Sequence, residues 1–267
     1  MTAPTSLFKY ESFSTQTLHN LKSQVIYFAS PLRFNDPYDC ALKPNLQPLT
    51  DAEVEAVRQH YLSQPGTPAR ARTEFETHSL ERLRESFMRA GREVFDKVVS
   101  DFLANNGVAC FSERNDDLLM WSHYGGQYKG ICLEFDTSQE PLSRIHPVQY
   151  VTTFPPLSVA KVLMDRDYNH ILELFCTKSS AWSYEREWRA IHKVAGTAFV
   201  YEARALKGVY FGPDISRQSL EIVCLILGGQ NDTVRFWQGS RSSTEFRVLF
   251  EPFTYTSHIE AKRKGLL

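Results

Sequence analysis

The sequence predicts an α+β protein with mixed, largely antiparallel sheets, flanking helices and a helical insertion. Apolar and polar residues alternate in several short segments, which is the pattern of half-buried strands. Helical stretches separate these segments at irregular intervals, which favours α+β over a doubly wound parallel sheet. A charged, purely helical block occupies about residues 50–106. We therefore expect a single domain, 1–267, with this block inserted into it.

The first predicted elements are a strand, a helix and a second strand. Residues 7–10 are a short apolar and aromatic run, and the stretch 15–23 carries leucines at helical spacing. Residues 25–30 are β-branched and aromatic and stop before a proline, which predicts a strand running into a loop. The loop at 34–39 contains Asn, Asp and Pro, which specify a turn because Asx side chains bond nearby amides and proline fixes φ.

The block 50–106 predicts two helices. Thr50 and Glu53 form a capping box ahead of the first helix, and residues 65–68 break it with two prolines and a glycine. One apolar stripe from Phe75 to Phe102 predicts a longer second helix. Gly91 is a weak point within that helix, because glycine is a poor helix former.

The second half of the chain predicts strands and helices in alternation. Strands are expected at 108–112, 131–136, 147–153, 185–194, 208–212 and 245–253, and helices at 117–124, 157–175 and 214–227. The tail after Ser257 is polar and basic, which predicts a frayed helix or coil.

Composition excludes several classes of function. Thirty Lys and Arg residues against 31 Asp and Glu give a net charge of −1, so no global attraction to nucleic acid or to an anionic membrane exists. Five cysteines are scattered singly, which predicts reduced thiols and no metal site. No stretch approaches the length of a transmembrane helix, and the N-terminus lacks the features of a signal peptide. We expect a cytoplasmic protein with no membrane partner.

Residues 182–189 hold two carboxylates, two guanidiniums and three aromatic rings. In an extended segment, Glu185, Glu187 and Arg189 would share one face, with the two carboxylates roughly 7 Å apart. An edge strand whose charges pair across the sheet would explain this composition structurally. Two carboxylates bordering a cleft would explain it catalytically, and the segment alone leaves both interpretations open.

Other candidate residues also have a structural and a functional interpretation. His123 is either a core or capping histidine, or a general base or ligand contact. Asn35 and Asp36 belong either to a well-capped turn or to a ligand site. Ser112 lies beside Glu113 as a turn residue would, and no Gly-x-Ser-x-Gly surrounds it. Lys178 is expected to be a surface charge.

Several segments resemble a widespread bacterial family known only as a domain of unknown function. They are Leu-Phe-Lys-Tyr at 7–10, Phe-Asn-Asp-Pro-Tyr-Asp at 34–39, Cys-Phe-Ser at 110–112, Met-Trp-Ser-His-Tyr at 120–124, Gly-Ile-Cys-Leu-Glu-Phe at 130–135 and Trp-Ser-Tyr-Glu-Arg-Glu-Trp-Arg at 182–189. The segments extend along the chain from end to end. This resemblance implies relatives without implying an activity.

The order of the predicted elements is also similar to that of mono-ADP-ribosyltransferases. Those enzymes have a strand with a polar residue, a helix, a strand with Ser, Thr or Tyr, and a later strand with a catalytic Glu, often written Glu-x-Glu. The segment 185–187 fits the last motif. Lys9 and Tyr10 stand where these enzymes usually have Arg or His, which is a departure from the pattern. Either Ser30 or Ser112 fits the middle motif, and the sequence does not choose between them.

This second resemblance implies an ADP-ribosyltransferase-like fold with NAD as co-substrate. Glu187 would bond a ribose hydroxyl and stabilise an oxocarbenium-like state, and Glu185 would orient or deprotonate the acceptor. Tyr10 or Tyr184 would stack on nicotinamide. An arginine such as Arg189 or Arg33 would pair with the pyrophosphate. The chain has no Gly-x-Gly-x-x-Gly, so a Rossmann mode of NAD binding is not expected.

Three functions therefore stand as hypotheses. The first is an NAD-consuming transferase, a toxin or anti-phage effector that modifies a protein or a nucleic acid. The second is a non-catalytic nucleotide- or peptide-binding sensor module of a defence system. The third is a hydrolase or nuclease that uses His123 with Asp36 or Asp39. The acceptor is an unknown macromolecule, and an antitoxin or defence partner is left open.

Overall fold

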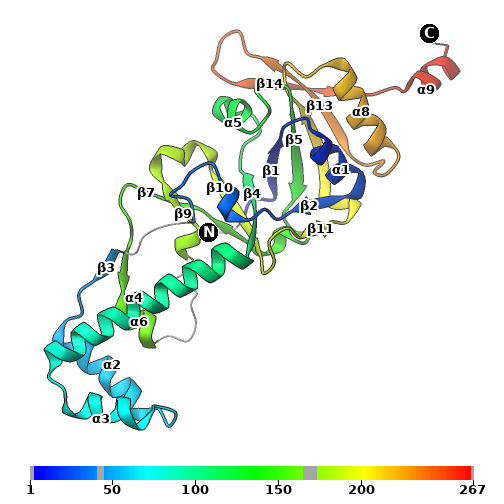
Figure 1. The fold of residues 1–267 in the computed structure, drawn as a ribbon. Coiled ribbons are helices and arrows are strands. Elements are labelled where there is room, and N and C mark those ends of the chain that lie inside the picture. The colour runs from blue at the N-terminus through cyan, green and yellow to red at the C-terminus, as the bar shows by residue number, and fades with distance from the viewer. Residues whose placement is uncertain (1–2, 41–44, 165–172, 266–267) are drawn as a thin grey trace. The chain divides into compact units, whose positions relative to one another are not determined.

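A computed structural model describes residues 3–40, 45–164 and 173–265 of the chain (Figure 1). Their contacts divide the chain into two compact units. The first unit comprises Met1–Ala29, Gly107–Val148 and Ala181–Leu267, and the second comprises Ser30–Asn106 and Gln149–Ser180. Within the described ranges, no helix is both long enough and apolar enough to cross a membrane.

An eight-stranded sheet forms the centre of the first unit, in the order β14-β13-β12-β5-β1-β4-β10-β6. Its strands are β1 (Ser6–Glu11), β4 (Gly107–Ser112), β5 (Ile131–Asp136), β6 (Ile145–Pro147), β10 (Glu187–His192), β12 (Leu206–Phe211), β13 (Arg235–Arg241) and β14 (Val248–Phe253). Only the β12–β13 pair of this sheet is parallel. The prediction of an α+β protein with a mixed, largely antiparallel sheet is confirmed.

The two faces of this sheet are covered by different elements. Helices α1 (Thr15–Ser23) and α8 (Arg217–Gly228) and strand β2 (Val25–Tyr27), which pairs with β11 (Ala198–Val200), bury apolar side chains against one face (Figure 1). The short helix α5 (Leu118–His123) packs on the other face, where the Trp121 ring lies 5.2 Å from the Tyr10 ring. Helix α9 (His258–Arg263) occupies the polar tail. Each central strand therefore has its alternate residues in two separate apolar layers.

The second unit contains the helices expected for the insertion. They are α2 (Asp51–Ser63), α3 (Ala69–Thr77) and α4 (Leu80–Asn105), and the predicted Thr50–Glu53 capping box begins α2. Two short parallel ladders accompany them, β3 (Asn45–Gln47) with β8 (Pro156–Ser158) and β7 (Gln149–Val151) with β9 (Thr177–Ser179). Residues 149–180 thus join the helical block in one unit, a grouping that the sequence did not indicate. The single-domain assignment stays a prediction.

Several predicted boundaries were wrong for local reasons. The stripe from Phe75 to Phe102 belongs to two helices, because the Ser79 side chain caps a new helix and interrupts the first. The strand expected at 147–153 is divided between β6 and β7. Helix α6 (Val159–Met164) forms the first part of the helix expected at 157–175, while residues 165–172 lie outside the described residues. Strand β13 was not expected at all.

Gly91 is a packing residue and not a weak point of α4. A Cβ atom at this position would lie 2.5 Å from Cγ1 of the fully buried Val159. Helices α4 and α6 can therefore pack this closely only because residue 91 has no side chain. We expect Gly91→Ala to destabilise the protein by up to about 2 kcal/mol, because the overpacking cost exceeds the roughly 1 kcal/mol gained in helix propensity. Chemical denaturation measures this change.

Gly66→Ala is the matched control, since no atom lies within 4 Å of the position that its Cβ would take. The double variant Gly91→Ala/Val159→Ala should recover part of the loss. A stabilising effect of Gly91→Ala alone would show that the two helices separate without cost.

Candidate functional site

A buried ion pair marks the start of strand β10. The Glu187 carboxylate accepts hydrogen bonds from Nε and Nη2 of Arg189, at 2.7 and 3.0 Å. Glu187 is 5% exposed and Arg189 is fully buried at 0%. Two residues apart on one strand, they project from the same face, as the sequence predicted. The Arg189 guanidinium therefore compensates the negative charge of the buried Glu187 carboxylate.

Three neighbouring strands bring the candidate residues into register. Glu187 of β10 is the direct partner of Ser112 of β4, and Ser112 is the partner of Phe8 of β1. Paired residues project from the same face of a sheet, and Tyr10 joins this face two residues beyond Phe8. Ser112, rather than Ser30, is thus the serine that the sheet brings beside Glu187.

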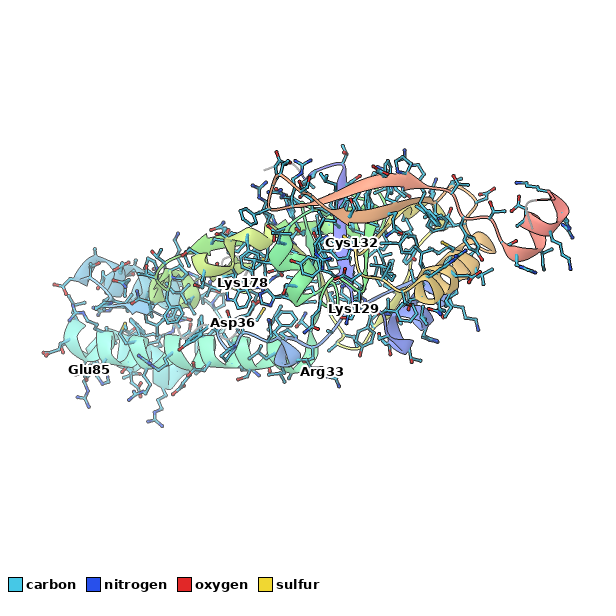
Figure 2. The ribbon with its side chains drawn as sticks, turned by 90° about the horizontal axis from the view of Figure 1, so that it is seen from above. Arg33, Asp36, Glu85, Lys129, Cys132 and Lys178 are labelled. Carbon is cyan, nitrogen blue, oxygen red and sulfur yellow. The ribbon has the colours of Figure 1, made fainter. Side chains whose placement is uncertain are left out.

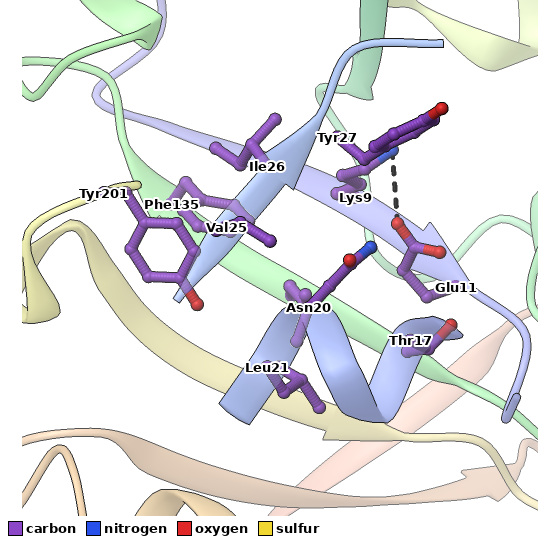
Figure 3. A pocket seen from close by; sticks show the side chains of 11 residues that line it. Lys9, Glu11, Thr17, Asn20, Leu21, Val25, Ile26, Tyr27, Phe135 and Tyr201 are labelled. Carbon is purple, nitrogen blue, oxygen red and sulfur yellow. Dashed lines mark ion pairs between the residues drawn. The ribbon is translucent and has the colours of Figure 1, made fainter. Parts of the chain in front are cut away.

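Lys9 lies on the opposite face from Glu187. Its ammonium group is 3.3 Å from the Glu11 carboxylate and lies over the ring of Phe111. Figure 3 shows this ion pair beside a cavity of about 10 Å³, which Leu21 and other apolar side chains line. Burial, the largest single influence, would lower the pKa of Lys9, but Glu11, Cys110 and Glu187 together outweigh burial and raise this pKa. Lys9 is consequently a charged group of the apolar layer and does not face Glu187.

Glu185 is not on the strand. The 3-10 turn η3 (Ser180–Glu185) ends at this residue, and Arg186 follows with a φ of 44°, so the backbone reverses before β10 begins. The Glu185 carboxylate is buried and accepts a 2.7 Å hydrogen bond from the Tyr124 hydroxyl. The expectation that Glu185 shares a strand face with Glu187 and Arg189 was therefore wrong.

The Ser112 hydroxyl fixes this turn against β4. It donates a 2.7 Å hydrogen bond to the Glu185 carbonyl and accepts one from the Arg114 amide. A buried hydroxyl that both donates and accepts a hydrogen bond to the backbone serves to position that backbone. Its effect is to hold the backbone of Glu185 beside the start of β10.

An aromatic cluster joins the helix motif at 120–124 to the motif at 182–189. The rings of His123, Trp182 and Tyr184 lie between 6.0 and 6.5 Å from one another, measured between centroids. His123 is exposed, whereas Trp182 and Tyr184 are half-buried. In the part of the chain that the structure describes, no group of three or more His, Cys, Asp or Glu residues could hold a metal ion. His123 is therefore an accessible imidazole in an aromatic surrounding.

Three predicted residues belong to the second unit. The Ser30 side chain caps the 3-10 turn η1 (Pro31–Arg33), so Ser30 is not on β2 as expected. Asn35 is exposed, and Asp36 accepts a 2.9 Å hydrogen bond from the Tyr38 amide, as an Asx turn requires. These contacts support the interpretation of residues 34–39 as a well-capped turn.

Lys178 was wrongly expected at the surface. It is 5% exposed, and its ammonium group lies 3.2 Å from the Asp39 carboxylate in the second unit. Figure 2 labels Lys178 and Asp36 in this unit. The loop motif at 34–39 thus supplies a buried ion pair through its last residue.

Two residues near Glu187 were missed by sequence reasoning. Tyr124 packs against the apolar cluster of Tyr10 and Trp121, and its hydroxyl bonds Glu185. Cys110 pairs with Arg189 across the β4–β10 ladder, and burial, followed by the nearby Glu187, raises the pKa of its thiol. Side chains alternate along a strand, so a strand at 108–112 places Cys110 on the same face as Ser112. The predicted strand was therefore enough to indicate that Cys110 lies near the candidate site.

The comparisons with known proteins agree with one resemblance seen in the sequence. Residues 120–190 match the family described as Protein of unknown function (DUF2971). This range includes the motifs at 120–124, 130–135 and 182–189, so it contains Glu185, Glu187 and the aromatic cluster. No curated protein and no solved structure matches the chain.

Proposed function

We propose that the protein is an NAD-consuming transferase of the ADP-ribosyltransferase type. The observation that carries this proposal is the register that sets Glu187 beside Ser112 on neighbouring strands, with Tyr10 on the same face. In chain order, β1, α1, β2, the serine-bearing β4 and the glutamate-bearing β10 follow the sequence of elements typical of these enzymes. An ADP-ribosyltransferase-like fold is part of the proposal.

The chemistry suits a carboxylate held in this way. When the nicotinamide–ribose bond breaks, the bonding electron pair leaves with nicotinamide and positive charge develops on the ribose. Glu187 would stabilise that charge, and its burial makes the interaction stronger than it would be in water. Arg189 balances the carboxylate in the free protein, and its guanidinium would be the partner of a pyrophosphate.

The second carboxylate has the role of acceptor activation. Glu185 would take the proton of an acceptor hydroxyl or amine, whose lone pair then forms the new bond to the ribose carbon. Tyr124 fixes the orientation of Glu185 through its hydroxyl. Tyr184 belongs to the same apolar layer as Tyr10 and is half-buried, so it is the better candidate for stacking on nicotinamide. The acceptor would be a protein or nucleic acid, in the setting of a toxin or a defence effector.

The partly exposed aromatic cluster favours a second candidate function. His123, Trp182 and Tyr184 could bind a nucleotide ring without any reaction, as in a sensor module of a defence system. Incubation with radiolabelled NAD and a cell lysate separates the two functions. Label transfer to a macromolecule supports the transferase, whereas binding with NAD left intact supports the sensor.

Glu187→Asp tests the catalytic role. This change keeps the negative charge opposite Arg189 but withdraws the carboxylate by one methylene, and displacements of this size cost on the order of 100-fold in rate. We expect nicotinamide release to fall by about that factor while the fold persists. Nicotinamide release is followed by chromatography at saturating NAD.

Glu251→Asp, at an exposed position of β14, is the matched control and should release nicotinamide at the wild-type rate. Equal rates for wild type and Glu187→Asp would remove Glu187 from the reaction. If wild type consumes no NAD with any acceptor in the lysate, the transferase proposal fails.

A further inference from the structure

Helix α8, strands β13 and β14 and the segment that follows β14 line an open cavity of about 460 Å³ in the first unit. This volume lies within the roughly 300–1,000 Å³ of small-molecule pockets. Strands β13 and β14 form the opposite end of the sheet order from β10. The cavity is therefore separate from the surroundings of Glu187, and the proposed transfer reaction does not use it.

Arg217 brings a cation to this cavity, and no carboxylate of the described residues forms an ion pair with it. Arg217 and Glu221 both line it and lie one turn apart on α8, at a spacing where Arg and Glu commonly pair. Among the described residues Arg217 forms no ion pair, while Glu221 accepts a 2.9 Å hydrogen bond from the Tyr255 hydroxyl. Burial, together with Glu221, raises the pKa of Tyr255 to about 12, so the hydroxyl keeps its proton.

The remaining lining is apolar and aromatic apart from Gln238 and two threonines. Leu220, Phe253 and Tyr255 belong to or pack against the main core of the first unit and form an apolar wall. Thr254 and Thr256 add hydroxyl groups that can donate or accept hydrogen bonds. A planar ring could lie against this wall while an anionic group reaches the guanidinium of Arg217.

We propose that this cavity binds a planar aromatic ring carrying an anionic group, which is the chemistry of a nucleoside monophosphate. Arg217 pairs with the phosphate through its planar fork of donors, a geometry that lysine does not offer. Phe253 and Tyr255 contact the base, and the threonine hydroxyls bond the sugar. Glu221 keeps its bond to Tyr255 and so leaves Arg217 available to the ligand.

Calorimetric titration with adenosine monophosphate, adenosine and inorganic phosphate tests the proposal. We expect the monophosphate to bind and the two fragments to bind at least about tenfold more weakly, because each lacks one half of the recognised chemistry. Arg217→Gln should weaken binding of the monophosphate by at least about tenfold. Arg235→Gln, an exposed arginine of β13 outside the cavity, should leave it unchanged.

The Tyr255 hydroxyl supplies a second test that a purely structural role would not reproduce. In Tyr255→Phe, Glu221 is released to pair with Arg217, so the affinity for the monophosphate should fall. Adding Glu221→Gln to Tyr255→Phe should restore the affinity, because the competing carboxylate is gone. The proposal is overturned if the monophosphate does not bind, if Arg217→Gln binds it as wild type does, or if phosphate alone binds as tightly. These titrations involve no NAD turnover, so their result is independent of the proposed transfer reaction.

Discussion

Replacing Glu187 with glutamine is expected to lower the free energy of unfolding by about 3–5 kcal/mol. Glutamine conserves the shape of the side chain but leaves the fully buried Arg189 guanidinium without its bidentate carboxylate. A buried cation that loses its bidentate carboxylate carries a desolvation penalty that a single amide oxygen offsets only in part. Urea denaturation followed by circular dichroism measures the loss.

Glu187→Asp identifies charge as the cause, because aspartate keeps the charge and loses a methylene. We expect its loss of stability to be clearly smaller than that of Glu187→Gln. The exposed Glu251→Gln should change stability by less than about 0.5 kcal/mol. If Glu187→Asp were as damaging as Glu187→Gln, packing and not charge would explain the role of Glu187 in the fold.

This stability cost changes how activity data are interpreted. A glutamine variant that loses both stability and NAD cleavage says nothing about catalysis, since the fold itself has been weakened. The aspartate variant separates the two effects, because the ion pair persists while the carboxylate moves. A structural ion pair and a catalytic carboxylate are therefore compatible roles for Glu187, and each has its own measurement.

Sequence patterns predicted those helices and strands that neighbouring residues in the sequence specify. Short apolar runs located β1 and β4, alternation located β5, and the Thr50–Glu53 capping box located the start of α2. In contrast, nothing in the composition of β13 (Arg235–Arg241) alternates cleanly, so this strand was missed. Its place in the sheet comes from pairing with β12 and β14, which are contacts distant in sequence.

The candidate site was predictable in its residue types but not in its geometry. Alternation separates Lys9 from Tyr10, yet only the pairing of β1 with β4 and of β4 with β10 decides which of them faces Glu187. The positive φ of Arg186 ends the extended run before Glu187, and an arginine gives no sign of such a turn. The hydrogen bond between Tyr124 and Glu185 joins residues 61 positions apart, beyond the reach of local patterns.

Replacing Lys178 with methionine is expected to destabilise the second unit by about 3–5 kcal/mol. The ammonium group lies 3.2 Å from the Asp39 carboxylate, and neither side chain is more than 5% exposed. Methionine fills a similar volume but removes the ammonium group from beside the buried Asp39 carboxylate. Hydrogen exchange is the suitable measurement, because it reports amides of the second unit separately from those of the first.

Lys161→Met is the matched control, since Lys161 is an exposed residue of α6 in the same unit. It should leave exchange in the second unit unchanged, whereas Lys178→Met should accelerate exchange across α4 and α6. Unchanged exchange in Lys178→Met would mean that the remaining contacts of Asp39 satisfy its charge without Lys178. Faster exchange confined to the second unit would instead show that the loop motif at 34–39 stabilises that unit through this ion pair.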